Sequence, residues 1–233
     1  MSAWRWILFP FGLLYWVITR MRNACYDTGI FTSHKIEGNS ICIGNLNVGG
    51  SGKSPLTLYL MKALQPTHTI QIVSRGYGRK TNGHIQLTAS HHAADVGDEP
   101  LMYFKQKKTA DEIHVSENRM DAIRKLNRDS TCVLLLDDAF QHRTVRAGFS
   151  ILVSDFNAPF FNDFILPIGN LREPRIGASR ADLVLFTKCP RELSADTKKR
   201  YIDKAATYGL SAFFSRITYA PLQSVLPRIL HHR

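Results

Sequence analysis

Continuous apolar runs recur along the chain, separated by segments in which apolar residues repeat at helical spacing. The runs lie at residues 40–43, 132–136, 149–153 and 183–186, with a β-branched run at 69–73. Such runs are typical of strands buried on both faces of a parallel sheet. Helical patterns lie at residues 54–64, 100–108, 116–128 and 196–210, the third expected to be capped by Ser116. Weaker strands lie near 84–88 and 211–219. We therefore predict an α/β fold, a mostly parallel sheet with helices on both faces.

Polar clusters follow four of the predicted strands. They occupy residues 44–54, 74–79, 137–142 and 187–188. The carboxyl ends of parallel strands meet at one edge of a sheet, where α/β proteins bind their ligands. The sequence therefore predicts that the four clusters share one site.

The first cluster contains a near match to the phosphate-binding loop G-x-x-x-x-G-K-[ST]. Asn47 stands where the pattern begins with glycine, and the rest of the loop follows it: Val48, Gly49, Gly50, Ser51, Gly52, Lys53 and Ser54. Glycines let backbone N–H groups turn toward phosphate oxygens at the start of a helix. We expect Lys53 to reach the β- and γ-phosphates and Ser54 to bind Mg²⁺, within a P-loop NTPase-like sheet. The alternative is a glycine-rich turn without a ligand.

Two acidic pairs supply carboxylates for this loop. Asp137 and Asp138 end a buried strand, where a P-loop protein holds Mg²⁺. Asp98 and Glu99 precede a helix whose first residue we expect to be Pro100, so Glu99 is either the helix N-cap or part of the site. A kinase needs a carboxylate to accept the proton of the acceptor hydroxyl, and Asp98 is a candidate. For Asp137 and Asp138, capping or a surface ion pair is the alternative.

Two basic loops carry candidate substrate contacts. Residues 74–79 place Arg75 and Arg79 around Tyr77, and residues 171–175 contain Arg172 and Glu173. Guanidinium groups in such loops bind phosphorylated ligands, although each loop alone is equally typical of a basic turn. His84, His91 and His92 match no zinc-binding spacing, so we expect loop histidines.

The N-terminus carries an apolar run, residues 6–19, between Arg5 and Arg20. The run is shorter than the about 20 residues of a membrane span and lacks the cleavage site of a signal peptide. Its tryptophans and Tyr15 suit a headgroup region, so we expect a helix lying in the cytoplasmic leaflet. Pro10 would kink this helix or mark its first turn. The alternative is an ordinary helix packed on the domain.

The overall composition narrows the choice of partner. With 30 Lys and Arg against 19 Asp and Glu, the formal net charge is +11, which suits a nucleotide, phosphorylated substrate, acidic lipid or nucleic acid. The aromatic residues follow no RNA-binding signature, so we expect no nucleic acid partner. The four cysteines form no C-x-x-C pair, and Cys42 and Cys132 lie in apolar runs. Free thiols in a reducing, cytosol-facing chain are therefore expected.

Six motifs, in this order, resemble the tetraacyldisaccharide 4'-kinase family of lipid A synthesis. They read IGNLNVGGSGKSP, SRGYGR, VGDEP, LLDDAFQHR, LPIGNLREP and ADLVLFTK. The resemblance runs from about residue 4 to 220. It implies ATP and Mg²⁺ as cofactors, a lipid A disaccharide 1-phosphate as phosphate acceptor, and a place at the cytoplasmic face of the bacterial inner membrane. We expect a monomer.

The resemblance also implies roles for individual residues. Asp98 resembles the carboxylate that activates the sugar hydroxyl, with Lys53 and Asp138 as its catalytic partners. Ser54, Glu99 and Asp138 match residues near the metal, and Asp137 is their neighbour. Positions around the substrate or phosphates match Arg75, Tyr77, Arg79, Arg119, Gln141, His142, Arg172 and Glu173.

The family continues beyond the matched region, with a second lobe that carries an Asp-His-His stretch. The resemblance therefore implies a membrane-associated helix at residues 1–30, a kinase domain at 31–210 and the start of an incomplete second lobe at 211–233. Two alternatives to a working kinase stay open. One is a nucleotide-binding fragment of the kinase that has lost its chemistry, and the other is a membrane-associated P-loop switch. The T-K-C-P sequence at residues 187–190 vaguely resembles a guanine-reading loop but lacks its aspartate.

Overall fold

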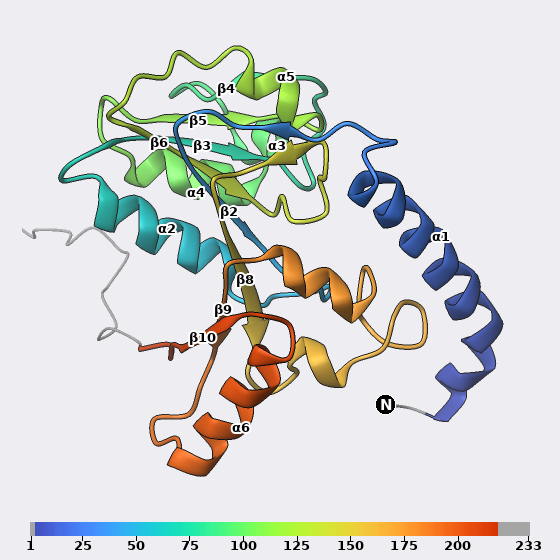
Figure 1. The fold of residues 1–233 in the computed structure, drawn as a ribbon. Coiled ribbons are helices and arrows are strands. Elements are labelled where there is room, and N and C mark those ends of the chain that lie inside the picture. Colours follow the sequence, from blue (N-terminus) through green and yellow to red (C-terminus); the bar gives the residue numbers. More distant parts are fainter. Residues whose placement is uncertain (1–2, 219–233) are drawn as a thin grey trace, which may run out of the picture.

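The computed structural model describes residues 3–218, which are built around one twisted sheet (Figure 1). The sheet has eight strands in the order β10-β9-β8-β2-β6-β3-β5-β4, all parallel except β4. Its strands are β2 (Asn39–Gly44), β3 (Thr69–Ser74), β4 (Ile85–Gln86), β5 (Glu112–Val115), β6 (Cys132–Asp137), β8 (Phe149–Asp155), β9 (Leu183–Thr187) and β10 (Ser211–Phe214). The predicted α/β class is confirmed.

Helices cover both faces of the sheet and surround its ends. They are η1 (Ala3–Leu8), α1 (Phe9–Asp27), α2 (Lys53–Leu64), α3 (Ala93–Val96), α4 (Asp98–Gln106), α5 (Arg119–Ile123), η2 (Phe160–Asn162), η3 (Arg175–Arg180) and α6 (Ala195–Ala206). Met61 of α2 and Tyr103 of α4 are fully buried in one core, with Ile70 and Ile72 of β3. A second core contains Phe160, Phe186 and Tyr201 of α6. Apolar strands enclosed in this way need no polar alternation.

The structure differs from the sequence prediction at three places. The segment predicted as a helix over residues 116–128 forms only the five residues of α5, and Asn118 rather than Ser116 is its N-cap, accepting a bond from the Met120 N–H. The Ser116 hydroxyl donates to the Asn118 carbonyl instead. The short strand β5 was missed, because Glu112 and His114 interrupt its apolar pattern. A small parallel sheet of β1 (His34–Lys35) and β7 (Val145–Arg146) was missed as well.

Helix α1 stands beside the sheet rather than against it (Figure 1). Pro10 lies in its first turn, as one of the two predicted alternatives required. Arg5 donates to the carbonyl oxygens of Pro167 and Gly169, at 3.2 and 2.8 Å. Gly12 is the buried residue of α1, and a Cβ there would lie 2.5 Å from Ile168 Cδ1. The helix therefore contacts the rest of the fold along one narrow face that contains Gly12.

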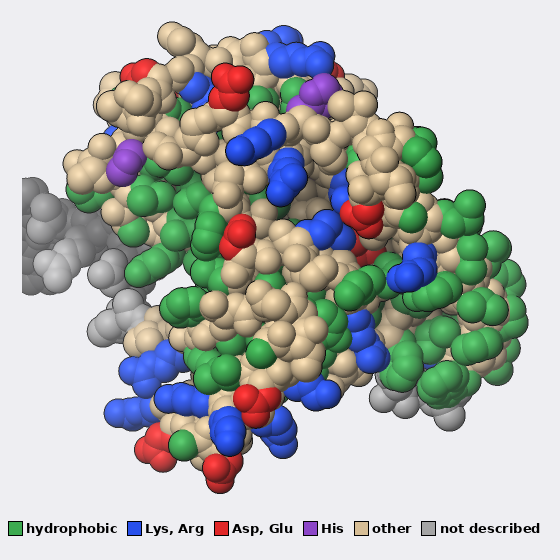
Figure 2. Space-filling view, in the orientation of Figure 1, with side chains coloured by type: hydrophobic (Ala, Val, Ile, Leu, Met, Phe, Trp, Pro, Cys, Tyr) green, Lys and Arg blue, Asp and Glu red, His purple; other side chains and the backbone are tan. Residues whose placement is uncertain are grey.

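The rest of α1 exposes apolar side chains, which Figure 2 shows as a hydrophobic surface over this helix. The most exposed large ones in η1 and α1 are Ile7, Phe11, Leu14, Ile18 and Met21. No helix within residues 3–218 has the length and apolar character that crossing a membrane requires.

The predicted division of the chain into three parts stays a prediction, although one of its segments can be located in the fold. Ser211–Phe214, expected at the start of a second lobe, forms the edge strand of the main sheet, paired in parallel with β9. Residues 219–233 lie outside the described part of the chain, so the division itself stays a prediction.

Candidate nucleotide and phosphoryl-transfer site

The phosphate loop connects β2 to α2 at the carboxyl edge of the sheet. Gly52 precedes α2 in the left-handed region, with a φ of 92°, and Gly49 has a φ of 105°. The space that a Cβ would fill is open at both Gly49 and Gly50. A loop of this shape at a helix N-terminus can present backbone N–H groups to phosphate oxygens.

Asn47, which replaces the first glycine of the pattern, anchors the loop. Its Nδ2 donates to Asp163 Oδ2 at 2.8 Å. The next residue, Val48, donates its N–H to the Asn170 carbonyl at 2.7 Å. An asparagine side chain therefore ties the start of the loop to the segment before η3, a bond that glycine could not make.

Asp138 lies just after β6, between two cations. Lys53 Nζ is 3.6 Å from Asp138 Oδ1, and Arg172 Nη1 donates to the same oxygen at 3.0 Å. Lys53 Nζ also donates to Asn45 Oδ1 at 3.2 Å. Asp138 has a φ of 46°, which is uncommon for a residue with a Cβ and is often found at functional sites. The strand end thus turns sharply where its carboxylate meets the phosphate loop.

The second acidic pair reaches the same place from α4. The Ser54 hydroxyl donates a hydrogen bond to Glu99 Oε1. Helix α4 begins at Asp98 with Gly97 as its N-cap, so Pro100 is its third residue and not its first as predicted. The alternative in which Glu99 is the N-cap is wrong for the same reason. Asp98 and Glu99 both lie in the exposed first turn of α4.

Asp137 is buried beneath these groups, with 1% of its surface exposed. Its carboxylate accepts bonds from three hydroxyls, those of Thr57 at 3.3 Å and of Ser74 and Tyr103 at 3.2 Å. Burial, with the negative charges of Glu99 and Asp138, raises the pKa of Asp137 to about 6. The carboxylates therefore form a concentration of negative charge that a cation would relieve.

The loop after β3 packs tightly on the loop before α4. Gly76 and Gly97 have φ values of 70° and 92°. A Cβ at Gly97 would lie 2.9 Å from the Tyr77 carbonyl oxygen, and one at Gly76 would lie 2.8 Å from the Val96 carbonyl oxygen. These contacts bring the S-R-G-Y-G-R and V-G-D-E-P motifs together, so Asp98 and Tyr77 belong to one edge of the site.

The three candidates of the loop after β3 differ in their contacts. Tyr77 is 87% exposed and Arg75 is also exposed. Arg79 instead folds back, forms an ion pair with Glu117 and donates to the Gly83 carbonyl at 2.7 Å. Its Nε and Nη1 are buried and find no partner among residues 3–218. Arg79 therefore braces the loop in this structure, whereas Arg75 and Tyr77 face solvent.

Arg119 and His142 lie behind the acidic strand end. Arg119 Nη2 donates to the carbonyl oxygens of Asp137 and Asp138, both at 3.2 Å. His142 Nε2 is buried and has no partner within the described residues. Burial and the positive charges of Arg119, Arg22 and Arg75 lower the pKa of His142 to about 4.

Glu173 connects three parts of the molecule from a buried position. It accepts bonds from Arg180 at 2.8 Å, from Gln141 Nε2 at 3.1 Å and from Asn23 of α1 at 2.8 Å. Tyr15 of α1 donates to the Arg172 carbonyl at 2.8 Å. The predicted substrate residues Gln141, Arg172 and Glu173 therefore form one network, and α1 is attached to it.

The residues present fit a magnesium ion. Mg²⁺ binds oxygen ligands and keeps several waters, using one or two carboxylates together with substrate phosphates. Ser54, Glu99 and Asp138 offer such oxygens at the phosphate loop. Within residues 3–218 no three His, Cys, Asp or Glu side chains are placed to hold a metal by themselves, so phosphate would have to complete this set.

Several residues of the site were missed by sequence reasoning. Asp137 accepts hydrogen bonds from Tyr103, Thr57 and Ser74. Lys53 donates to Asn45, and Glu173 accepts from Arg180. Asn45 and Ser74 fall within the predicted clusters at strand ends, a signal that could have found them. Tyr103 and Thr57 sit on helices at ordinary core positions, and nothing in their spacing distinguishes them.

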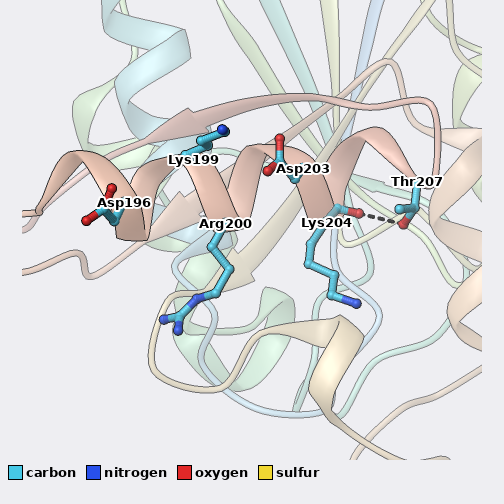
Figure 3. Close-up of a pocket in the computed structure, with 6 residues that line it drawn as sticks. All are labelled: Asp196, Lys199, Arg200, Asp203, Lys204 and Thr207. Carbon is cyan, nitrogen blue, oxygen red and sulfur yellow. Dashed lines mark hydrogen bonds between the residues drawn. The ribbon is translucent and has the colours of Figure 1, made fainter.

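Two surface hollows lie away from this edge. One of about 480 Å³ runs along α6, and Figure 3 shows its lining residues, Asp196, Lys199, Arg200, Asp203, Lys204 and Thr207. Acids and bases alternate along that helix face, which is typical of a solvated surface. The other, of about 400 Å³, includes Ser40, Val133 and Phe149, at the amino ends of the central strands. Neither hollow contains a residue of the phosphate loop.

A phosphate loop after β2, an acidic strand end after β6 and a parallel sheet define a P-loop nucleotide-binding protein. Comparison with known families identifies the family within this class. The tetraacyldisaccharide-1-P 4'-kinase family matches residues 4–221, and the chain belongs to this family. The resemblance noted in the sequence is thereby confirmed.

Curated relatives in this family share about two fifths of their residues with the chain. Tetraacyldisaccharide 4'-kinase of Flavobacterium psychrophilum is 41% identical over 94% of this chain and 65% of its own length. The Flavobacterium johnsoniae protein is 43% identical over 84% of this chain and 58% of its own length. The Bacteroides thetaiotaomicron protein is 38% identical over 94% of this chain and 59% of its own length. The chain thus spans about three fifths of the length of these relatives.

A crystal structure of LpxK from Aquifex aeolicus, described as in complex with ATP, has the same fold. It superposes with a TM-score of 0.70 and 27% sequence identity, covering 97% of this chain and 86% of the other. A P-loop kinase fold that holds ATP in this relative agrees with the loop geometry described above.

Proposed function

We propose that this chain is an ATP-dependent kinase that transfers the γ-phosphate to the 4'-hydroxyl of a tetraacyldisaccharide 1-phosphate in lipid A biosynthesis. One observation carries the proposal. The phosphate loop meets both acidic pairs at one edge of the sheet, through the contacts of Ser54 with Glu99 and of Lys53 with Asp138. Membership in the kinase family supplies the substrate class.

The phosphate loop and its neighbours would bind and orient the nucleotide. Backbone groups of residues 47–54 would surround the phosphates, and Lys53 would exchange its contact with Asp138 for phosphate oxygens. Ser54, Glu99 and Asp138 would hold Mg²⁺, with the buried Asp137 behind them. The bound ion would offset the negative charge that develops during phosphoryl transfer.

Asp98 is the proposed general base. It is exposed and adjacent to Glu99, which touches Ser54. A carboxylate at this position can accept the proton of a sugar hydroxyl directed at the phosphate loop. The packing of Gly97 on Tyr77 fixes where α4 begins, and therefore the position of Asp98.

The acceptor would bind between the basic loops. Arg75 and Tyr77 face solvent beside Asp98, and we propose that they contact the phosphorylated sugar. Arg79 would support their loop. On the other side, the network of Gln141, Arg172 and Glu173 would complete the substrate site. Arg119 and His142, which lie behind the acidic strand end, are proposed to belong to the same side.

The exposed apolar surface of α1 supports a place on a lipid surface. We propose that the chain binds peripherally to the cytoplasmic leaflet of the inner membrane through α1, flanked by Arg5, Arg20 and Arg22. We also propose that residues 1–30 act as a membrane-associated helix and residues 31–210 as a kinase domain to which the edge strand β10 belongs, with any second lobe starting after β10. The chain is proposed to be monomeric and to bind no nucleic acid.

The test is a phosphoryl-transfer assay in detergent micelles with Mg-ATP and a lipid A disaccharide 1-phosphate. Asp98→Asn is expected to lower the rate by about 10²–10⁴-fold while ATP binding is retained, because only the proton acceptor is removed. Lys53→Ala is expected to weaken both transfer and ATP binding. Asp196→Asn is the matched control, because Asp196 is an exposed acid in the first turn of α6.

Each other outcome contradicts part of the proposal. ATP binding without product would mean that the chain is a nucleotide-binding protein without kinase activity. Tighter binding of GTP than ATP would favour the switch. Full activity of Asp98→Asn would remove Asp98 from the role of general base.

A further inference from the structure

The loop after β9 contacts the phosphate loop through residues to which the proposed function gives no role. Lys188 follows β9 with a φ of 57°, in the left-handed region that residues with a Cβ seldom adopt. Thr187, the last residue of β9, is 7% exposed. Backbone strain of this kind persists only where surrounding contacts hold it.

The Lys188 side chain joins two strand ends. Its Nζ donates to the Gly50 carbonyl oxygen at 2.6 Å and to Asp155 Oδ2 at 2.7 Å. Asp155 ends β8, so the ammonium group ties the phosphate loop to the neighbouring strand. Bonds between charged groups of this length are among the stronger ones in proteins.

Thr187 holds the next peptide of the loop. Its hydroxyl donates to the Ser51 carbonyl oxygen at 2.6 Å. The space for a Cβ at Gly52 lies 3.4 Å from the Thr187 side chain, so the two segments are in contact. Two consecutive residues at the end of β9, Thr187 and Lys188, therefore hold two consecutive carbonyl groups of the phosphate loop.

Holding these carbonyls determines where the adjoining N–H groups point. In a planar trans peptide the N–H points opposite the C=O. Fixing the carbonyls of Gly50 and Ser51 thus fixes the N–H directions of Ser51, which donates to the Gly49 carbonyl at 3.0 Å here, and of Gly52, which directly precedes Lys53. A site whose donors are already oriented binds without the cost of ordering them.

We propose that Thr187 and Lys188 are positioning residues that preorganise the phosphate loop for the phosphate groups of the nucleotide. Asp155 supports them by holding the Lys188 ammonium. The inference rests on the proposed nucleotide site, but it concerns phosphate binding alone and not transfer to an acceptor. The T-K-C-P sequence thereby acts on the phosphates, independently of any recognition of the base.

The test compares binding of Mg-ATP and of inorganic tripolyphosphate by calorimetry, using the full chain. Lys188→Met and Thr187→Val keep the side-chain volume and remove the bond to the loop. Each is expected to weaken binding of both probes by about tenfold and by the same factor, since a charged or buried hydrogen bond is lost. Thr187→Ser restores the hydroxyl and is expected to restore affinity. Lys199→Met, on the exposed face of α6, is the matched control.

The outcomes separate this inference from the proposed function. Unchanged affinity for both probes in the variants overturns the positioning role. Loss of ATP affinity with unchanged tripolyphosphate affinity assigns these residues to the base or ribose and also overturns it. If the unaltered chain binds neither probe, the nucleotide site itself is wrong. If binding responds as expected but no product forms, only the transfer step fails. The Thr187→Val and Thr187→Ser pair keeps the test decisive should Lys188→Met unfold.

Discussion

At the scale of single residues, Gly97 is where the loop before α4 meets the loop after β3. Gly97→Ala is expected to destabilise the fold by about 1–3 kcal/mol, because its φ of 92° disfavours a Cβ that would also lie 2.9 Å from the Tyr77 carbonyl oxygen. Equilibrium unfolding in urea measures the change. Gly83→Ala is the control, with a φ of 77° and open space around the added atom. Equal destabilisation of the two variants would show that the close contact adds nothing.

His142 gives the site a dependence on pH. Its pKa is lowered from 6.5 to about 4 by burial and by the charges of Arg119, Arg22 and Arg75. Between these values the unfolded chain binds a proton that the folded chain does not. The contribution of His142 to stability is therefore complete above pH 6.5 and is lost as the pH falls toward 4. His142→Gln is expected to reduce the loss of stability between pH 7 and pH 4.5.

Comparing the pH dependence of stability of the unaltered chain with that of His142→Gln isolates the contribution of His142. Asp137, whose pKa is raised to about 6, acts in the opposite direction, and its contribution is lost as the pH rises from 3.8 to 6. Since both proteins contain Asp137, its effect cancels in the difference. Unfolding curves at several pH values give that difference, and parallel curves for the two proteins would contradict the assigned pKa.

The residues of the phosphate loop were predictable because their spacing alone places a lysine and a hydroxyl at the start of a helix. The different environments of the two neighbouring acids, Asp137 buried and Asp138 beside the phosphate loop, were not predictable. Adjacent residues at a strand end point to opposite sides, and only the packed structure shows which side Tyr103 and Thr57 occupy. The distinct role of Arg79 was hidden for a similar reason, since its partner Glu117 lies far along the chain.

At the scale of elements, α1 offers a surface that the rest of the fold leaves uncovered. Replacing Leu14 and Ile18, 59% and 55% exposed, by glutamate is expected to weaken binding to anionic vesicles by more than about tenfold. Co-sedimentation with vesicles containing phosphatidylglycerol measures the binding. Because the two side chains are exposed, the urea midpoint is expected to stay the same.

The control for this change is Ile202→Glu on α6. Ile202 is 45% exposed, so it tests the loss of a similar side chain elsewhere on the surface. Equal binding of the α1 variant and the unaltered chain would exclude α1 as the lipid contact.

Long apolar elements were predicted well, and short or polar ones were not. β2, β6, β8 and β9 stand where their apolar runs are, because burial on both faces demands such sequences. β5 escaped notice because Glu112 bonds to Gln71 and His114 stacks on His84 at the sheet edge. At the start of α5, Arg119 turns inward to the carbonyls of Asp137 and Asp138, which a helical repeat cannot reveal.

At the scale of the whole molecule, nucleotide binding and folding should be coupled. Mg-ATP at about 100 times its dissociation constant is expected to raise the free energy of unfolding by about 2.7 kcal/mol, because it binds only the folded chain. Thermal unfolding at increasing Mg-ATP concentrations measures the shift. Lys53→Ala is expected to abolish most of it, and an unchanged shift in that variant would contradict the proposed phosphate contact.

The convergence of the site was foreseeable from the fold class, since parallel strands end at a common edge. The strand order was not, because the sequence does not show that β2 lies between β6 and β8. That order places the acids of β6 on one side of the phosphate loop and Lys188 on the other. The functional division across the loop is thus a property of topology rather than of any motif.

The attachment of α1 to the loops of the site has a geometric consequence. Arg5 of η1 and, further along, Tyr15 and Asn23 of α1 bond to residues between 167 and 173. If α1 lies on a bilayer, these bonds hold the kinase domain, and with it Asp98, at a fixed distance from the membrane surface. An acceptor anchored in that bilayer would then be found by lateral diffusion in two dimensions, and its sugar would arrive at one fixed elevation.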